Sequence, residues 1–189
     1  MSRQALHELN LLLGTGDLTC ELSDHGVGKA LVSQWPIQLG TEAFVGVART
    51  VDAGQGDVPS VKATASQLAK GEVLIVNATS APGAVFGGNL ANIATERGAA
   101  GVVVDGLVRD VPQIRQLGLT VRARGAVPNR SVADGSGVVG AQVHIDGVAV
   151  VSGDIVVADG SGIVVIPATY KSELEQFIVQ ARSPSRSEE

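Results

Sequence analysis

The residues whose types and spacing suit chemistry lie in one stretch, 87–110, with the sequence GGNLANIATERGAAGVVVDGLVRD. A glycine pair precedes a predicted short helix, and the first amide groups of a helix have no acceptor within it. The amides concerned are those of Gly88, Asn89 and Leu90. A helix start of this kind attracts anions. Arg109 and Asp110 follow the next predicted strand and would bring a cation and a carboxylate beside this helix start. The stretch therefore predicts a site for the carboxylate of a small oxo acid, with Asp110 able to hold a divalent metal ion.

The same residues also have a purely structural interpretation. Gly87 and Gly88 would then form a tight turn between a strand and a helix, and Arg109 and Asp110 would be a surface ion pair at the start of the following helix. The pattern is a spacing of residue types and not a metal-binding constellation. From the residues alone, both interpretations stay open.

Hydrophobic periodicity places this stretch in a chain of alternating strands and helices. Apolar residues at helical spacing predict helices, while short and nearly continuous apolar runs predict strands covered on both faces. Asp57 is a candidate N-cap, with Pro59 in the first turn of the helix that follows. In the first two thirds of the chain, helices are predicted at 3–13, 57–71, 88–98 and 111–117, and strands at 43–51, 72–77, 101–104 and 119–123, with a glycine turn at Gly106.

The last third of the chain has a different pattern. From Val138 onward, short apolar strands are separated by turns that include Asp146-Gly147, a dipeptide typical of hairpins. A helix is predicted again at 173–181, followed by a tail rich in serine and charge. We therefore predict one α/β domain at 1–181, with three layers of mixed sheets and outer helices, and a flexible C-terminal tail at 182–189.

Composition narrows the class of protein. The chain has 189 residues, of which 44% are hydrophobic and only 3% aromatic, so its core must consist mainly of aliphatic side chains. The net charge of −5 and the lack of a basic stripe argue against nucleic-acid binding. Cys20 is alone, which excludes a disulfide framework and a cysteine zinc site. No apolar run approaches the roughly 20 residues of a membrane span. We expect a soluble, cytoplasmic protein that binds neither nucleic acid nor membranes.

Two further patterns have structural explanations. The segment 135–140 (GSGVVG) matches G-x-G-x-x-G, but a strand follows it where a dinucleotide-binding loop needs a helix, so a glycine turn is the preferred interpretation. The three histidines, His7, His25 and His144, are scattered along the chain. His144 lies in a predicted strand as a packed or surface side chain, and for His25 a structural role is also preferred.

Several motifs, in the right order, resemble those of one family. Gly88, twenty intervening residues and Arg109-Asp110 match the G-x20-R-D signature of class II pyruvate aldolases of the 4-hydroxy-4-methyl-2-oxoglutarate type, which share a fold with the ribonuclease E regulator RraA. The segments 22–24 (LSD), 71–76 (GEVLIV) and 102–110 (VVVDGLVRD) are similar to family motifs, as is the closing block 152–167 (SGDIVVADGSGIVVIP). The resemblance covers most of the chain.

The resemblance implies a swivelling β/β/α domain that assembles as a homotrimer or a dimer of trimers, with active sites in clefts between subunits. It implies that the helix start at Gly88, through the amides of Asn89 and Leu90, binds the pyruvyl carboxylate of a 2-oxo acid. Arg109 would contact the carboxylate and the keto oxygen as the catalytic residue. Asp110 would hold Mg²⁺ or Mn²⁺, directly or through water, and an oxygen-ligated site suits a hard cation.

One position departs from the aldolase pattern. The signature continues R-D-x2-E/D, and here the last position is Gln113, which is neutral. Glutamine cannot supply a second anionic group near the metal, so a weaker metal site is expected. In the aldolases a supporting carboxylate comes from the C-terminal region of a neighbouring subunit, and the candidates here are Glu188 and Glu189.

Three functions compete. The first is metal-dependent cleavage of a 4-hydroxy-2-oxo acid, or decarboxylation of oxaloacetate, which Arg109-Asp110 favours and Gln113 opposes. The second is a non-catalytic regulator like RraA, which binds and inhibits ribonuclease E. Members of this regulator branch often lack the Asp after the Arg. The third is the methyltransferase activity in menaquinone synthesis that is sometimes attached to this family, for which the sequence has no matching nucleotide-binding loop.

Overall fold

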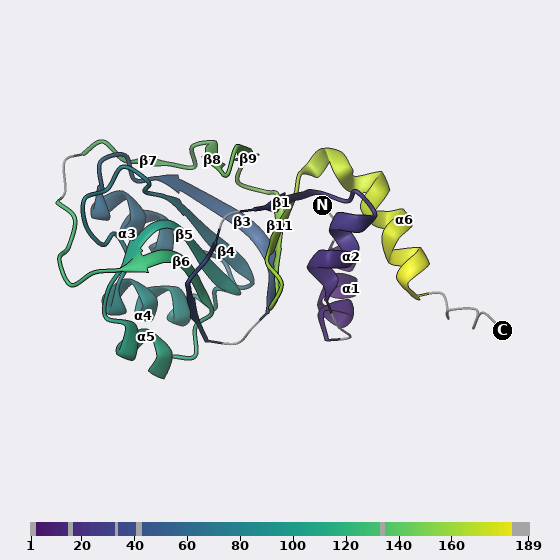
Figure 1. Ribbon diagram of the computed structural model, residues 1–189, viewed down its shortest axis with the longest axis horizontal. Helices are drawn as coiled ribbons and strands as arrows, with labels where there is room; N and C mark the ends of the chain where they lie inside the picture. Colours follow the sequence, from purple (N-terminus) through teal and green to yellow (C-terminus); the bar gives the residue numbers. More distant parts are fainter. Residues whose placement is uncertain (1–2, 15–16, 33, 41–42, 133–134, 183–189) are drawn as a thin grey trace.

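The computed structural model describes residues 3–14, 17–32, 34–40, 43–132 and 135–182 (Figure 1). Its helices are α1 (Arg3–Leu13), α2 (Leu18–Asp24), α3 (Val58–Ser66), α4 (Gly88–Glu96), α5 (Val111–Gln116), the 3-10 helix η1 (Ala168–Tyr170) and α6 (Lys171–Arg182). Its strands are β1 (Lys29–Leu31), β2 (Ile37–Leu39), β3 (Phe44–Asp52), β4 (Glu72–Asn77), β5 (Gly101–Val108), β6 (Val121–Ala126), β7 (Val138–Val139), β8 (Val143–Ile145), β9 (Val148–Val150), β10 (Ile155–Ala158) and β11 (Ile163–Ile166).

Within these residues, nine strands form one mixed sheet in the order β1-β11-β10-β3-β4-β5-β6-β2, and β7 pairs with the far end of β3. The four strands from β3 to β6 run parallel, whereas the other pairs are antiparallel. Parallel neighbours need crossover connections, and α3, α4 and α5 supply them. These helices lie together beside β4, β5 and β6 (Figure 1).

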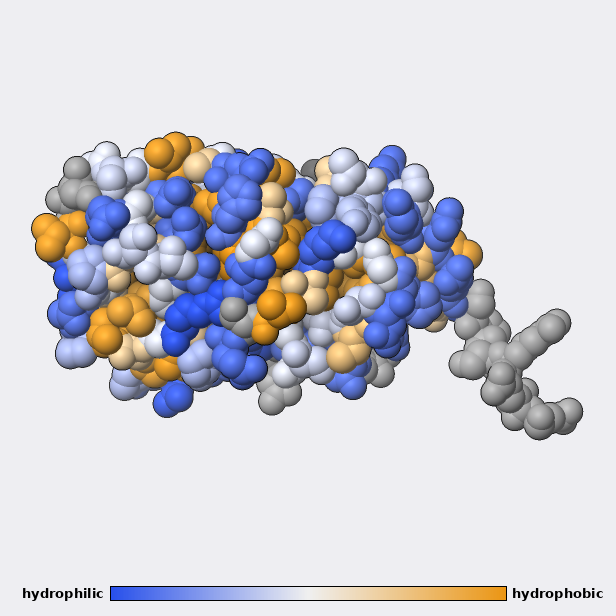
Figure 2. Space-filling model, turned by 45° about the horizontal axis from the view of Figure 1, so that its top comes forward, coloured by the Kyte–Doolittle hydropathy of each residue, from blue (hydrophilic) through white to orange (hydrophobic). Residues whose placement is uncertain are grey.

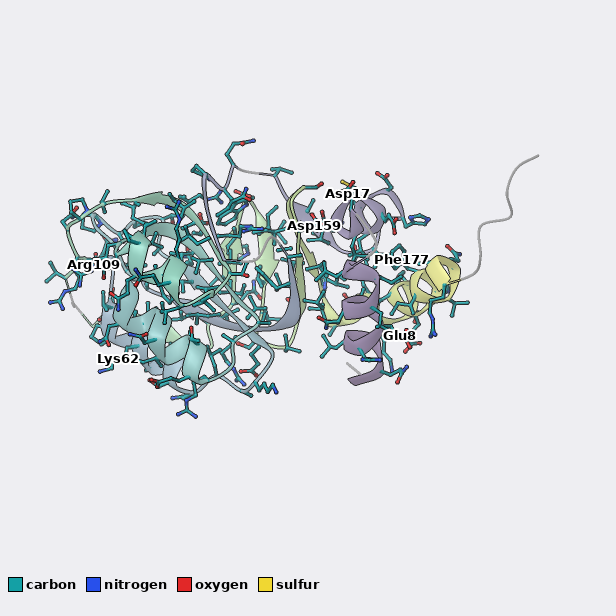
Figure 3. All side chains as sticks on the ribbon, turned by 90° about the horizontal axis from the view of Figure 1, so that it is seen from below. Glu8, Asp17, Lys62, Arg109, Asp159 and Phe177 are labelled. Carbon is teal, nitrogen blue, oxygen red and sulfur yellow. The ribbon has the colours of Figure 1, made fainter. Side chains whose placement is uncertain are left out.

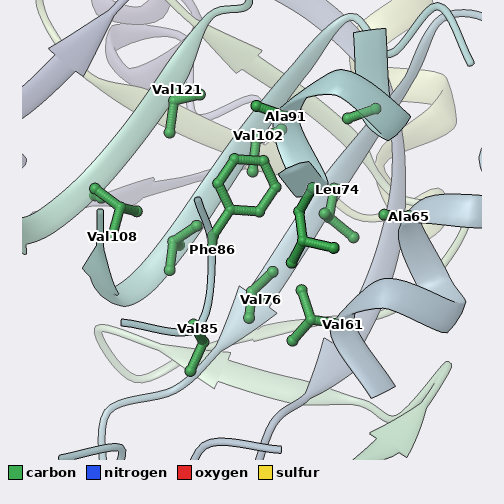
Figure 4. Close-up of a cluster of buried hydrophobic side chains, with 14 of the residues drawn as sticks. Val61, Ala65, Leu74, Val76, Val85, Phe86, Ala91, Val102, Val108 and Val121 are labelled. Carbon is green, nitrogen blue, oxygen red and sulfur yellow. The ribbon is translucent and has the colours of Figure 1, made fainter. Parts of the chain in front are cut away.

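Side chains of β4 alternate between two cores. Leu74 and Val76 face α3 and α4, where they pack around Phe86 (Figure 4). Val73 and Ile75 face the other way and pack against strands β10 and β11 and the β8–β9 hairpin. The antiparallel part of the sheet therefore folds over the parallel part, so that the two halves lie face to face.

The helices of the two chain ends cover the outer face of β10 and β11. Residues such as Val157 and Ile166 point away from the parallel strands and pack against Leu9, Leu22 and Leu174. Figure 1 shows α1, α2 and α6 on the opposite side of β11 from α3, α4 and α5. The expected mixed α/β fold is confirmed, and the terminal helices add an outer layer to the β/β/α arrangement.

Most predicted elements are present, with differences at their boundaries. The turn expected at Gly106 is wrong: β5 continues to Val108, with an irregularity in its pairing with β6 between Val104 and Leu107. A Cβ at position 106 would lie 2.9 Å from the Cβ of Ala78, so this glycine permits a close approach of two chain segments. The strand expected at 119–123 lies at Val121–Ala126.

The predicted hairpin turn at Asp146-Gly147 is confirmed. Both residues have positive φ, 52° and 77°, as a type I′ turn requires. Asp57 also caps α3 as predicted, because its side chain accepts from the amide of Ser60. Of the predicted tail 182–189, Arg182 is the last residue of α6, and 183–189 lie outside the described residues.

Polar and apolar side chains are interspersed over the surface face in Figure 2, where the apolar ones form small patches between polar neighbours. Among the described residues, no helix combines the length and the apolar character needed to cross a membrane.

Candidate functional site

A short extended segment before α4 brings the site residues together. The amide of Val85 donates to the carbonyl of Leu107, and the amide of Arg109 donates to the carbonyl of Phe86, so this segment runs beside the end of β5. On its other side, the amide of Ala84 donates to the carbonyl of Asn129. The start of α4, the end of β5 and the loop after β6 therefore meet at one end of the molecule.

Asp110 turns the chain from β5 into α5 and points back to α4. Its φ of 57° lies in the left-handed region, which Asp tolerates better than most residues. In this conformation Oδ2 accepts from the amide of Gly88 at 3.1 Å. The same oxygen lies 3.6 Å from Nε of Arg109. The carboxylate thus sits at the helix start, where a negative charge is favourable.

The amides at the start of α4 are not equivalent. The prediction of three free amides is wrong for Gly88, because Asp110 accepts from it. Among the described residues, the amides of Asn89 and Leu90 have no acceptor. Two donors are therefore left for an incoming anion beside the Arg109 guanidinium, whose side chain is 38% exposed.

Gln113 lies directly over the helix start. A Cβ added to Gly88 would overlap the side-chain amide of Gln113, so the two residues are in close contact. At Gly87 a Cβ would lie 2.8 Å from Oδ2 of Asp110 and 2.9 Å from Cγ of Arg109. The glycine pair therefore leaves room for the three polar side chains, in addition to forming the turn into α4.

A cleft of about 650 Å³ opens at this end of the molecule, within the range of small-molecule sites. Its walls come from α3, the segment before α4, the start of α4, the end of β5 and the loop after β6. The lining residues are Val58, Pro59, Lys62, Ala63, Ser66, Ala84, Val85, Phe86, Gly87, Asn89, Leu90, Arg109, Asp110, Arg130 and Ser131.

Four of the five predicted site residues line this cleft. They are Asn89, Leu90, Arg109 and Asp110. Gly88 does not line it and instead holds the Asp110 carboxylate. Sequence reasoning missed Lys62 and Arg130, which line the same cleft from elements distant in sequence. Nothing in their local sequence marks them, because a single basic residue in a helix or a loop is common.

The described residues contain no cluster of three or more His, Cys, Asp or Glu side chains that could hold a metal ion. Among those that line the cleft, Asp110 carries the one carboxylate. Glu188 and Glu189, proposed as supporting carboxylates, lie outside the described residues. The described residues that line the cleft therefore offer a metal at Asp110 a single carboxylate ligand.

The other motifs lie away from the cleft. His25 is exposed at the end of α2, where its ring packs edge-on against Phe177, and His144 is exposed on β8. The G-x-G-x-x-G segment contains β7 and is followed by β8, not by a helix, so the turn interpretation is confirmed. Neither feature contributes a lining residue to the cleft.

Comparison with known proteins identifies the family. The family model described as RraA-like, Aldolase/RraA, matches residues 19–165. A Thermus thermophilus protein named 4-hydroxy-4-methyl-2-oxoglutarate aldolase is 35% identical over 151 residues, which cover 79% of this chain and 92% of that protein. The chain belongs to the RraA-like family.

Solved structures with this fold carry different names. Streptomyces coelicolor RraAS2, described as an unusual member of the RNase ES inhibitor RraA family, matches with a TM-score of 0.75 and 28% identity over 96% of this chain and 91% of that one. A Geobacillus kaustophilus protein described as an S-adenosylmethionine:2-dimethylmenaquinone methyltransferase matches with a TM-score of 0.73 and 31% identity, covering 78% and 93% of the two chains. The fold is therefore shared by proteins to which an inhibitor and an enzyme function are attached.

Proposed function

We propose that this protein is an aldolase that cleaves 4-hydroxy-2-oxo acids of the 4-hydroxy-4-methyl-2-oxoglutarate type to pyruvate, with decarboxylation of oxaloacetate as a related activity. The observation that carries the proposal is the juxtaposition of Arg109, Asp110 and two free helix-start amides in one cleft. Both reactions share a single demand, which is stabilisation of the pyruvate enolate. The 35% identity to a protein named as such an aldolase supports the same reaction class.

Some residues of the cleft bind the substrate carboxylate, and Arg109 also stabilises the negative charge that develops in the reaction. The amides of Asn89 and Leu90 bind the carboxylate of the 2-oxo acid, assisted by the positive end of α4. Arg109 donates to that carboxylate and to the keto oxygen. When the C3–C4 bond breaks, its electron pair passes to C3 and the keto oxygen as the enolate. The C4 hydroxyl gives its proton to water and becomes the carbonyl of the other product, and C3 then takes up a proton from water to give pyruvate. The guanidinium stabilises the charge on the keto oxygen during this step.

The site is compatible with a hard divalent cation. Oδ2 of Asp110 is engaged by Gly88 and Arg109, whereas Oδ1 has no partner among the described residues, and the side chain is 41% exposed. Mg²⁺ commonly binds through one or two carboxylates and keeps several waters. We therefore assign Asp110 as the residue that holds Mg²⁺ or Mn²⁺. When bound, such an ion supplies a Lewis acid that polarises the keto oxygen.

The first test measures pyruvate release from 4-hydroxy-4-methyl-2-oxoglutarate and from oxaloacetate, with Mg²⁺ or Mn²⁺ and again with EDTA. We expect turnover that EDTA abolishes.

Asp110→Asn should remove the metal-dependent activity without unfolding the site, because Asn also tolerates the left-handed backbone and can accept from Gly88. Arg109→Met should lower kcat by about 100- to 1,000-fold, the usual loss for a group that stabilises an oxyanion.

The controls are Asp24→Asn and Arg115→Met, which change exposed residues that do not line the cleft. Both should leave turnover unchanged. Full activity in Asp110→Asn would remove Asp110 from the mechanism. Turnover that persists in EDTA would show that the reaction proceeds without a divalent ion.

The alternative is a non-catalytic regulator of the RraA kind that binds ribonuclease E. Gln113 favours it, because this side chain covers the helix start where the aldolase signature has an acid. Absence of turnover with either metal would support this alternative, and the next measurement would be inhibition of ribonuclease E. Under either function we propose a homotrimer or a dimer of trimers, as the family resemblance implies, and a small 2-oxo acid as the ligand of the aldolase.

A further inference from the structure

We propose that Lys62 and Arg130 form a second anion site in the cleft and make it selective for 2-oxo acids that carry a second carboxylate. This inference rests on the proposed function, because it assigns the first carboxylate to Arg109 and the start of α4. It adds two specificity-determining residues that lie on elements outside the family signature. The second carboxylate would belong to the part of the substrate that leaves as the other product.

Helix α3 presents Lys62 to the cleft through its helical spacing. Pro59, Lys62, Ala63 and Ser66 line the cleft, whereas Val61 and Ala65 are buried against the sheet. At 1.5 Å per residue, the lining face of α3 from Pro59 to Ser66 spans about 10 Å. Figure 3 shows Lys62 and Arg109 at the same end of the molecule, far from the terminal helices. One wall of the cleft is thus long enough for an extended diacid.

Arg130 lies on the loop that pairs with the segment before α4. Its two neighbours are held by backbone hydrogen bonds, since Asn129 accepts from the amide of Ala84 and the amide of Ser131 donates to Ala84. The same segment pairs with the end of β5 one residue before Arg109. The backbones of both arginines are therefore fixed on opposite sides of one short segment, while the Arg130 side chain stays exposed.

The charge balance of the cleft is opposite to that of the whole protein. The chain carries a net charge of −5, yet the described cleft residues include three cations, Lys62, Arg109 and Arg130, and one carboxylate. That carboxylate, Asp110, is already engaged by Arg109 and the Gly88 amide. Within the described part of the chain, neither Lys62 nor Arg130 has an ion-pair partner. A cleft with this excess of positive charge favours a ligand with more than one negative charge.

Apolar residues also line the cleft. Val58, Val85 and Leu90 are among them, and they can pack against the carbon chain of a ligand. The arrangement fits a short carbon chain with an anionic group at each end. Arg109 and the helix start take the 2-oxo carboxylate, and Lys62 and Arg130 take the distal one.

The kinetic test compares two substrates that differ only at the distal group. 4-Hydroxy-2-oxoglutarate carries a second carboxylate where 4-hydroxy-2-oxopentanoate has a methyl group, and both release pyruvate. The wild-type protein should prefer the diacid in kcat/KM. Lys62→Met and Arg130→Gln should each lower kcat/KM for the diacid by about ten- to a hundredfold, as expected for loss of a hydrogen bond to a charged group. Both variants should leave kcat/KM for the monoacid within about twofold.

A binding measurement separates this inference from the proposed function. Calorimetry with 2-oxoglutarate and with 2-oxopentanoate, at fixed Mg²⁺ concentration, does not depend on turnover. Tighter binding of the diacid to wild type, lost in Lys62→Met and Arg130→Gln, supports the second anion site even when no substrate is cleaved. Equal affinity for the two acids, or a preference that survives both substitutions, overturns it whatever the activity.

Matched controls are available for both substitutions. Lys70→Met and Arg115→Gln change exposed basic residues on connections or helices that do not line the cleft. Each removes one positive charge from the protein, as the test variants do. A loss of diacid preference in these controls as well would show that overall charge, and not the two cleft residues, determines the selectivity.

Discussion

At Asp110 the backbone and the carboxylate act on the site together. The left-handed conformation ends β5 sharply and turns Oδ2 back toward the Gly88 amide, 22 residues earlier in the chain. Asp and Asn tolerate this region because their short polar side chains bond locally, whereas a β-branched residue would be strained there. The position therefore requires both a tolerant backbone and an acceptor, which explains an Asp here independently of any metal.

Gly87 is the residue whose substitution best tests the site geometry. Its extended backbone is open to any residue, so Gly87→Ala should change stability little. The new Cβ would lie within 3 Å of both Arg109 and Asp110 and must displace them. Because a shift of about 1 Å can cost a hundredfold in rate, we expect pyruvate release to fall by about ten- to a hundredfold.

Kinetics and thermal melting of Gly87→Ala measure the two effects separately. Gly160→Ala is the control, because a Cβ at Gly160 meets no other atom and its φ is not in the left-handed region. This control should resemble wild type in both measurements. Unchanged kcat/KM in Gly87→Ala would mean that the positions of Arg109 and Asp110 at this spot do not matter for turnover.

At the scale of elements, the sequence predicted the parts of the site that are local and missed those that depend on tertiary structure. Asp57 as a cap and β4 as a buried strand follow from local patterns, and both are present. The extension of β5 past Gly106 was not predicted, because a glycine between apolar runs indicates a turn unless the close approach of Ala78 is known. Lys62 and Arg130 reach the cleft through pairings between distant segments, which a single sequence does not show.

Hydrogen bonds between two segments that are distant in sequence also attach α2 to the sheet. Helix α2 has no side-chain cap from its own N-cap residue, Asp17. Instead the buried carboxylate of Asp159, in the β10–β11 turn, accepts from the amide of Thr19 at 2.8 Å and from its hydroxyl at 2.6 Å. The same side chain also accepts from the amides of Ser161 and Gly162. One carboxylate thus closes a turn and caps a helix that lies 140 residues away.

Asp159→Ala should therefore lower the free energy of unfolding by about 2–4 kcal/mol, because it leaves two buried and two partly buried donors without an acceptor. Thr19→Val removes only the hydroxyl bond and should cost about 1 kcal/mol. Urea unfolding of the two single variants and the double variant measures the coupling. Additive effects would show that the Thr19 hydroxyl does not stabilise the protein through Asp159, because Thr19→Val leaves the amide bond to Asp159 in place.

At the scale of the whole molecule, a charged network joins the parallel strands to the β8–β9 hairpin and to the β1–β2 connection. The Arg124 side chain of β6 pairs with Asp105 of β5 at 2.6 Å and with Asp146 of the β8–β9 turn at 2.9 Å. Its guanidinium stacks on Trp35, 3.8 Å from the ring centroid. The two carboxylates are nearly buried, so this arginine fixes the hairpin and the β1–β2 connection against the parallel strands.

The two face-to-face halves of the sheet lie between the cleft and the terminal helices (Figure 1). Figure 3 places Arg109 and Lys62 at one end of the molecule and Glu8 and Phe177 at the other. The two regions nevertheless share one sheet, because β3 and β10 are paired neighbours that connect its two halves. We infer that the molecule unfolds as a single unit, while local changes in the terminal layer leave the geometry of the cleft intact.

Leu174→Ala tests this separation. Leu174 of α6 is fully buried against the outer face of β10 and β11, so its truncation should lower the free energy of unfolding by about 2–5 kcal/mol. Because one sheet joins the layers, fluorescence and circular dichroism should report the same urea transition, shifted as a whole. Pyruvate release and diacid binding, measured well below the transition, should match wild type. An early transition confined to one probe would show that the terminal helices unfold independently. A fall in kcat/KM with the fold intact would show that the terminal helices position the cleft residues, and it would contradict the inferred separation.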